Sequence, residues 1–225
     1  MGLKSVIKGF LKMSGVYAGS ATYLAEHGYT DEYMELLEQA RAKAKKKADR
    51  QEGQALYAQA LMFRGELKRA AAEYEKVDID RLPKAIKGVV TGNFILCLFL
   101  LEKPAQIKEL LSQRNAEAFS GSSLIMRRNV GIQEYVNRRY ENAVTVFVKL
   151  VGLPDPRATL MADICLVKTL LKLDMNDRAG EIAGMGFDRY NGRGELTTLV
   201  NSLRLRINSP KDHGGSGGKK KKKHK

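Results

Sequence analysis

Apolar residues recur at every third or fourth position through most of the chain, the pattern of amphipathic helices. The clearest example is residues 55–77, ALYAQALMFRGELKRAAAEYEKV, where two such stretches are separated by Gly65. Glycine readily adopts the positive φ that ends a helix, so this segment predicts two antiparallel helices joined by a tight turn. Approximate copies recur at intervals near 36 residues; the turn glycines Gly28 and Gly65, for example, are 37 apart.

The copies share a common register. Small or apolar residues 12 positions apart mark the two helices of each later copy, in the pairs Ala58 and Ala70, Ile95 and Ile107, Gly131 and Ala143, and Val167 and Ala179. A periodic array of helix pairs predicts an all-α solenoid, because each pair buries its apolar face only by stacking on its neighbours.

The predicted repeat domain covers residues 14–208 and contains about five helix pairs and a C-terminal capping helix. The pairs are residues 14–47, 51–83, 84–115, 122–156 and 157–190, and the cap is residues 194–208. In the first pair, Thr30 is expected to cap the second helix, with Asp31 and Glu32 placed favourably at its N-terminus. Pro104 is expected in the first turn of a helix, and the composition of residues 115–123, NAEAFSGSS, predicts a loop.

Ala58, Gly65, Ala70 and Tyr74 have the spacing of four consensus positions of the tetratricopeptide repeat (TPR) family, which segment 55–77 resembles. That consensus has a small residue in the first helix, a turn glycine seven residues later, a small residue five further on, and an aromatic after four more. The fourth copy keeps Gly131, Ala143 and Phe147 but carries Arg138 at the turn. The resemblance implies a right-handed α-solenoid whose first helices line a concave surface that binds peptides.

The resemblance places particular residues on that concave surface: Gln59, Met62, Phe63, Phe99, Arg128, Tyr135, Lys168 and Lys172. An apolar middle followed by basic groups predicts a partner protein or peptide with apolar anchors and acidic groups. Two alternatives remain open at this stage. Leu96, Phe99 and Leu100 would instead pack between repeats, and Arg127 and Arg128 would be solvated.

Residues 1–13 combine apolar positions with Lys4, Lys8 and Lys12 on the opposite face of a predicted helix. Such a helix fits two interpretations. It either packs on the first repeat or lies on an anionic membrane surface.

The net charge of +14 is concentrated in two places. One is segment 41–50, RAKAKKKADR; the other is the tail 209–225, where a Gly/Ser linker precedes Lys219, Lys220, Lys221, Lys222, Lys223 and Lys225. The linker and lysine run are too polar to fold alone and predict disorder. The lysines favour a polyanion, with an anionic membrane ranked above nucleic acid, unless the run is an added tag.

We find no catalytic constellation in the sequence. His27 precedes a predicted turn, and His213 and His224 lie in the tail. Cys97 and Cys165 sit in apolar runs without metal-ligand spacing, which indicates buried reduced thiols. We therefore expect a non-enzymatic scaffold or adaptor without cofactor or metal. Its longest apolar run, residues 94–101, is too short to span a membrane, so we expect it in the cytoplasm, with association at a membrane surface as the alternative.

Overall fold

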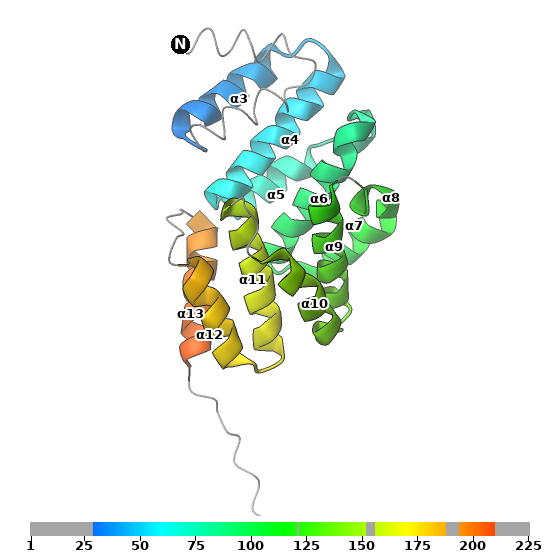
Figure 1. The fold of residues 1–225 in the computed structure, drawn as a ribbon. Helices are drawn as coiled ribbons and strands as arrows, with labels where there is room; N and C mark the ends of the chain where they lie inside the picture. The colour runs from blue at the N-terminus through cyan, green and yellow to red at the C-terminus, as the bar shows by residue number, and fades with distance from the viewer. Residues whose placement is uncertain (1–28, 121, 152–155, 188–193, 210–225) are drawn as a thin grey trace, which may run out of the picture.

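The structure, a computed structural model, describes residues 29–120, 122–151, 156–187 and 194–209 (Figure 1). Every regular element in these ranges is helical, which confirms the all-α prediction. The elements are α3 (Asp31–Lys43), α4 (Lys47–Arg64), α5 (Leu67–Glu75), η1 (Ile79–Arg81), α6 (Lys84–Leu100), α7 (Pro104–Gln113), α8 (Asn115–Ala118), α9 (Ser123–Val136), α10 (Tyr140–Phe147), η2 (Val148–Leu150), α11 (Pro156–Lys172), α12 (Asn176–Gly186) and α13 (Gly194–Asn208).

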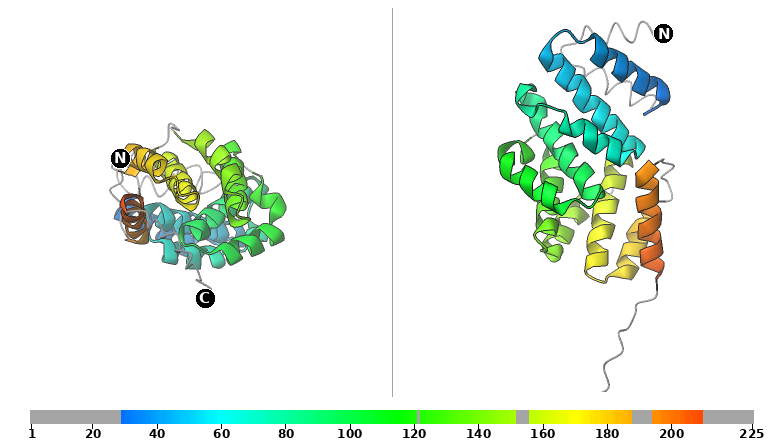
Figure 2. Two further views of the ribbon diagram at one scale, coloured as in Figure 1. Left: turned by 90° about the horizontal axis from the view of Figure 1, so that it is seen from below. Right: turned by 180° about the vertical axis from the view of Figure 1, so that it is seen from behind.

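The most extensive helix contacts are those of α4 with α5, α9 with α10, and α11 with α12, and α6 packs on α7 in the same order along the chain. Successive pairs also touch through α5 and α6, α6 and α9, and α10 and α11. The helices therefore follow one another around the molecule instead of forming one flat layer, as the view from below in Figure 2 shows.

The turn inside each pair has the same backbone geometry. A residue one or two positions after each first helix has a positive φ: Gly65 (95°), Glu102 (57°), Arg138 (62°) and Asp174 (56°). These positions are 37, 36 and 36 residues apart. The next amide N–H donates to the carbonyl five residues earlier, at 2.9–3.0 Å, in the pairs Glu66 to Leu61, Lys103 to Leu98, Arg139 to Glu134 and Met175 to Leu170. This is the Schellman motif, which satisfies the last carbonyls of a helix.

The residue five positions after each of these turns is buried where the two helices meet. These residues are Ala70, Ile107, Ala143 and Ala179, each with at most 1% of its surface exposed. Helices α9 and α10 approach closely here, since a Cβ on Gly131 would overlap the ring of Phe147. A glycine on one helix therefore makes room for an aromatic ring on the other.

The start of α3 follows the predicted cap. The Thr30 hydroxyl oxygen accepts a 3.2 Å hydrogen bond from the Tyr33 amide, and Asp31 and Glu32 occupy the first turn. Pro104 begins α7, also as predicted. Several expectations lie outside the described residues: the helix in 1–13, the first helix of the first pair, the Gly28 turn and the tail 210–225.

The predicted loop at residues 115–123 is wrong in its first half. Residues Asn115–Ala118 form the short helix α8, which packs on α6. The Ala118 side chain is buried, and its carbonyl accepts a 2.6 Å hydrogen bond from Asn129 Nδ2. Tertiary contact, not composition, orders this turn of helix.

Helix α13 covers α12, as expected of a cap, and also touches α11 and α5. Its buried residues are Leu196, Val200 and Leu203. At its start, the Leu196 amide donates to the carbonyl oxygen of Gly65, in the turn between α4 and α5, at 3.1 Å. The rear view in Figure 2 shows the start of α13 beside the end of α4. The last described helix thus returns to the first complete pair.

Candidate functional site: a basic and aromatic pocket

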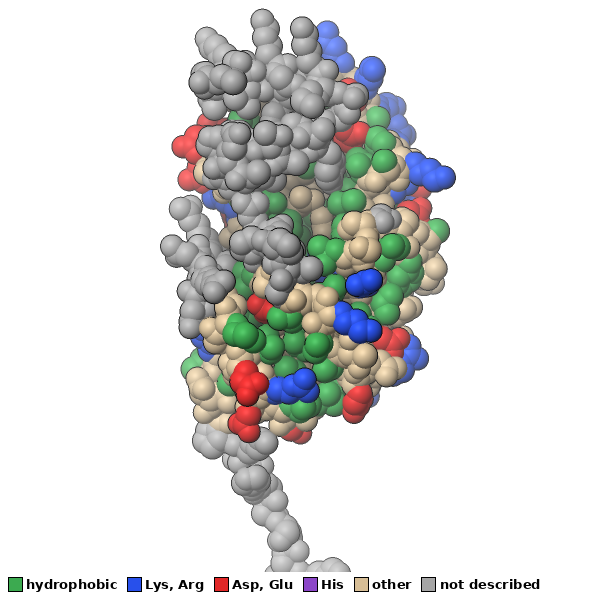
Figure 3. Space-filling view, viewed as in Figure 1, with side chains coloured by type: hydrophobic (Ala, Val, Ile, Leu, Met, Phe, Trp, Pro, Cys, Tyr) green, Lys and Arg blue, Asp and Glu red, His purple; other side chains and the backbone are tan. Residues whose placement is uncertain are grey.

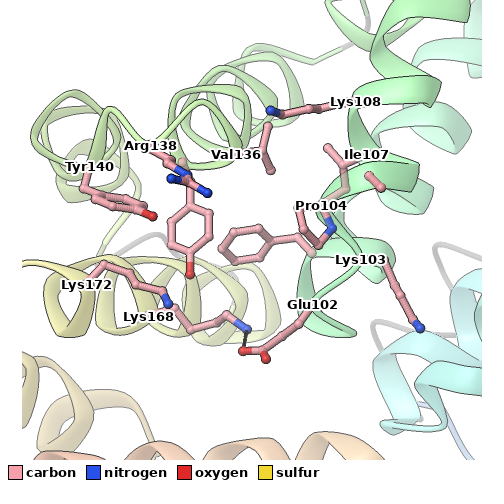
Figure 4. A pocket seen from close by; sticks show the side chains of 13 residues that line it. Glu102, Lys103, Pro104, Ile107, Lys108, Val136, Arg138, Tyr140, Lys168 and Lys172 are labelled. Carbon is pink, nitrogen blue, oxygen red and sulfur yellow. Dashed lines mark hydrogen bonds and ion pairs between the residues drawn. The ribbon is translucent and has the colours of Figure 1, made fainter.

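A pocket of about 530 Å³ opens where three helix pairs meet (Figure 4). It is lined by the end of α6, the α6–α7 turn, α7, the end of α9, the α9–α10 turn, the start of α10, and α11. The lining residues are Phe99, Glu102, Lys103, Pro104, Ala105, Ile107, Lys108, Tyr135, Val136, Arg138, Tyr140, Lys168 and Lys172. Two of the four repeated turns, at Glu102 and Arg138, thus contribute to one site.

Three aromatic rings form a continuous wall. Phe99 and Tyr135 meet edge to face with centroids 4.9 Å apart, and Tyr135 and Tyr140 do so at 5.3 Å. Burial, with smaller contributions from the Glu102 carboxylate and Tyr140, raises the pKa of Tyr135 to about 12. The Tyr135 phenol is therefore neutral at physiological pH and able to donate a hydrogen bond.

A buried lysine lies beside this wall. The Lys168 ammonium is 5.2 Å from the Phe99 ring centroid and 2.8 Å from Glu102 Oε1. Burial lowers the pKa of Lys168, and the Glu102 carboxylate opposes that effect. In turn, the hydrogen bond from Lys168 lowers the pKa of Glu102. The ion pair therefore favours the charged form of both groups.

Four further cations line the pocket: Lys103, Lys108, Arg138 and Lys172. The ion pairs found among the described residues include none of them. Among the described residues, Glu102 is the one acidic residue in the lining. The pocket therefore has a surplus of positive charge beside an apolar wall. On the face seen in Figure 3, Lys and Arg side chains gather along the upper right edge, and others lie among apolar and acidic side chains.

Half of the residues assigned from sequence to a binding surface meet in this pocket: Phe99, Tyr135, Lys168 and Lys172. The others lie elsewhere. Met62 is buried in the core, Gln59 Oε1 accepts a 2.8 Å hydrogen bond from Asn93, and Phe63 stacks on Tyr29 with centroids 5.3 Å apart. A single surface formed by all eight residues is therefore wrong.

From sequence, Arg128 is assigned either to the partner-binding surface or to solvent, and both interpretations are wrong. Its side chain is buried, and Nη2 donates 3.0 Å hydrogen bonds to the Gly92 carbonyl and to Asn93 Oδ1. Burial lowers its pKa to about 10. By contrast, Arg127 is exposed.

Packing between helices accounts for the apolar candidates. Leu96, Phe99 and Leu100 are all buried, in agreement with the alternative that they pack between repeats. Helix α6 contacts α9, and α11 contacts both α9 and α10, so the inner faces of the first helices cover one another. Only the rim of Phe99 reaches the pocket, together with the partly exposed Tyr135.

The sequence pattern does not single out Glu102, Lys103, Lys108, Arg138 and Tyr140, because the resemblance assigns binding to the first helices alone. These residues lie in the turns and in the second helices of their pairs. The 36-residue spacing of Glu102 and Arg138 was a usable signal, since equivalent turns of adjacent repeats point to the same side of an array.

Other candidate chemistry is limited. Burial raises the pKa of both Cys97 and Cys165 to about 12, so these thiols are unreactive at neutral pH. Within the described residues, no group of three His, Cys, Asp or Glu side chains is placed to hold a metal ion. In the same ranges, no helix combines the length and apolarity needed to cross a membrane.

Comparisons of the chain with protein-family models, curated proteins and solved structures found no match.

Proposed function

We propose that the protein is a non-enzymatic scaffold that binds an acidic peptide segment of a partner protein in the pocket between α6–α7, α9–α10 and α11. The observation that carries this proposal is the convergence of three aromatic rings and five basic side chains on one pocket. We place the pocket on a right-handed TPR-like α-solenoid in the cytoplasm.

The pocket dimensions and chemistry support a peptide. A volume of about 530 Å³ lies within the range of small-ligand sites, roughly 300–1,000 Å³, and accommodates a few side chains. Acidic side chains of the partner would pair with Lys108, Arg138 and Lys172. An aromatic or aliphatic side chain between them would pack against Tyr135 and Tyr140.

Support for the TPR-like architecture comes from the repeated turn and the residue that follows it. The positive-φ positions are spaced by 36–37 residues, and a buried small or apolar residue lies five positions after each. This combination matches the resemblance carried by Gly65, Ala70 and Tyr74. The spacing is slightly longer than the 34 residues usual for that family.

The test is a binding titration with a labelled peptide in which Glu residues flank a Phe, compared with the same peptide carrying Gln for Glu. Lys108→Glu combined with Lys172→Glu should weaken binding of the acidic peptide about tenfold or more, the equivalent of about 1.4 kcal/mol. The matched control combines Lys45→Glu with Lys149→Glu, which changes the net charge equally at exposed positions outside the pocket. Equal loss in both double variants, or no binding by the unaltered protein, would contradict the proposal.

A second candidate function is association with an anionic membrane surface. The six lysines in the last seven residues favour it, because each lysine near such a surface contributes roughly 1 kcal/mol. This function is compatible with peptide binding, since the tail and the pocket are separate parts of the chain.

A further inference from the structure

We propose that Glu102 is an internal counter-ion of the pocket, and that a carboxylate of the bound ligand displaces it from Lys168. This inference rests on the proposed function and assigns the position in the pocket that recognises the acidic group. It also makes Glu102 a built-in competitor of the ligand.

The two partners of the ion pair differ in their surroundings. The Lys168 side chain is only 2% exposed, whereas the Glu102 side chain is 64% exposed. Lys168 is held on α11 against the Phe99 ring. Glu102 projects from the turn between α6 and α7, and Figure 4 shows the two side chains meeting at the edge of the pocket. Lys168 is thus the fixed partner, and Glu102 is the one able to swing into solvent.

A buried ammonium group needs a counter-ion, because an unpaired buried charge is strongly destabilising. Glu102 supplies that counter-ion in the structure as it stands. A ligand carboxylate at the same place would restore the pairing, so exchanging one carboxylate for another leaves Lys168 satisfied. Exchange therefore avoids the cost of leaving the buried Lys168 ammonium without a counter-ion.

The place occupied by the Glu102 carboxylate also favours negative charge beyond the pair itself. Besides Lys168, two further cations lower the pKa of Glu102: Lys172, also on α11, and Arg206 on α13. Three cations on two helices thus act on one carboxylate. Tyr135 lines the same pocket, and the Glu102 carboxylate contributes to the raised pKa of its phenol. The surroundings form an anion position that exists before any ligand arrives.

Removing the competitor should strengthen ligand binding. Glu102→Gln keeps the size of the side chain but removes its charge, so Lys168 is left to pair with an external carboxylate. We expect the acidic peptide to bind about five- to tenfold more tightly to Glu102→Gln, and the Gln-containing peptide to bind with unchanged affinity. Lys168→Met, which retains an apolar buried chain, should abolish this gain when combined with Glu102→Gln.

A peptide-independent probe separates this inference from the proposed function. Glutarate has the carboxylate-bearing chain of a glutamate side chain, and a ligand that binds only the folded state raises the unfolding temperature. Excess glutarate should raise the unfolding midpoint of Glu102→Gln by about 2–4 °C more than that of the unaltered protein. The Glu102→Gln/Lys168→Met double variant should lose that difference.

The outcomes are distinct. A glutarate response that is the same in all three proteins would overturn the role of Glu102, even if the peptide binds as proposed. A glutarate response confined to Glu102→Gln would support the anion position, even if the chosen peptide failed to bind. If Glu102→Gln binds the acidic peptide more weakly than the unaltered protein, Glu102 acts as a structural partner of Lys168 and the inference is wrong.

Discussion

The amide of Leu196 donates a hydrogen bond to the carbonyl oxygen of Gly65, which lies 131 residues earlier in the chain. Gly194 permits this contact in two ways. Its φ of 64° is in the left-handed region, and a Cβ at this position would lie 2.9 Å from the same carbonyl oxygen. The junction between α13 and the α4–α5 turn therefore depends on a residue without a side chain.

Gly194→Ala should lower the free energy of unfolding by about 1–3 kcal/mol, because it adds left-handed strain and a close contact. Gly184 on α12 is the matched control, since a Cβ there meets nothing within 4 Å. Gly184→Ala should be neutral or stabilising by about 0.5–1 kcal/mol, as helix propensity favours alanine. Chemical denaturation of both variants checks this, and equal effects would contradict the described junction.

Ala70→Leu should destabilise the protein by about 1–3 kcal/mol, because Ala70 is fully buried where α5 meets α4. Ala72 lies two residues later on the same helix and is exposed. Ala72→Leu should therefore change stability by less than about 0.5 kcal/mol. Thermal unfolding of the two variants tests whether the close approach of α4 and α5 at Ala70 stabilises this helix pair.

Asp163 on α11 is buried, with Oδ1 unpaired among the described residues, and burial raises its pKa to about 6. A carboxyl whose pKa is raised on folding binds more protons in the native state, so stability should fall as pH rises from about 4 to about 6. Asp163→Asn should remove that fall and raise stability at pH 7 by about 1–3 kcal/mol. Denaturant titrations at pH 4 and pH 7 measure the difference. A gain of the same size at both pH values would argue against ionisation as the cause.

Asp174→Gly should stabilise the α11–α12 turn by about 1 kcal/mol, because Asp174 holds a φ of 56° that glycine adopts without cost. Asp177, in the first turn of α12, offers the opposite case. Asp177→Gly should destabilise by about 1 kcal/mol through lower helix propensity and loss of a favourable charge at the helix N-terminus. If both glycine variants shift stability in the same direction, the positive φ is not the deciding factor.

Deletion of residues 210–225 should sharply weaken binding to vesicles that contain phosphatidylserine, since it removes the lysine run. The same deletion should leave peptide binding in the pocket unchanged. Vesicle sedimentation at two salt concentrations measures the effect, which should decrease as salt rises. Equal vesicle binding with and without the tail would reject a role as a tether.

The helical class and the register of the pairs are predictable from sequence because they depend on local patterns. Thr30 caps α3 through its own neighbours, and Ala70 and Ala143 mark helix contacts within one repeat. The binding surface was only partly predictable, because exposure depends on contacts between distant helices. Arg128 appears as a surface cation in the sequence, yet α6 and α9 enclose it. Helix α8 shows the same limit, since packing overrides a loop-like composition.

The contact between α13 and the α4–α5 turn bears on how the molecule unfolds. In an open array each repeat interacts only with its neighbours, so an end unit can fray while the rest stays folded. Here α13 bridges α12 and the α4–α5 pair, so loosening the C-terminal helix also removes a support from the turn at Gly65. Hydrogen exchange should accordingly show similar protection in α13 and α5, and loss of both in one cooperative step.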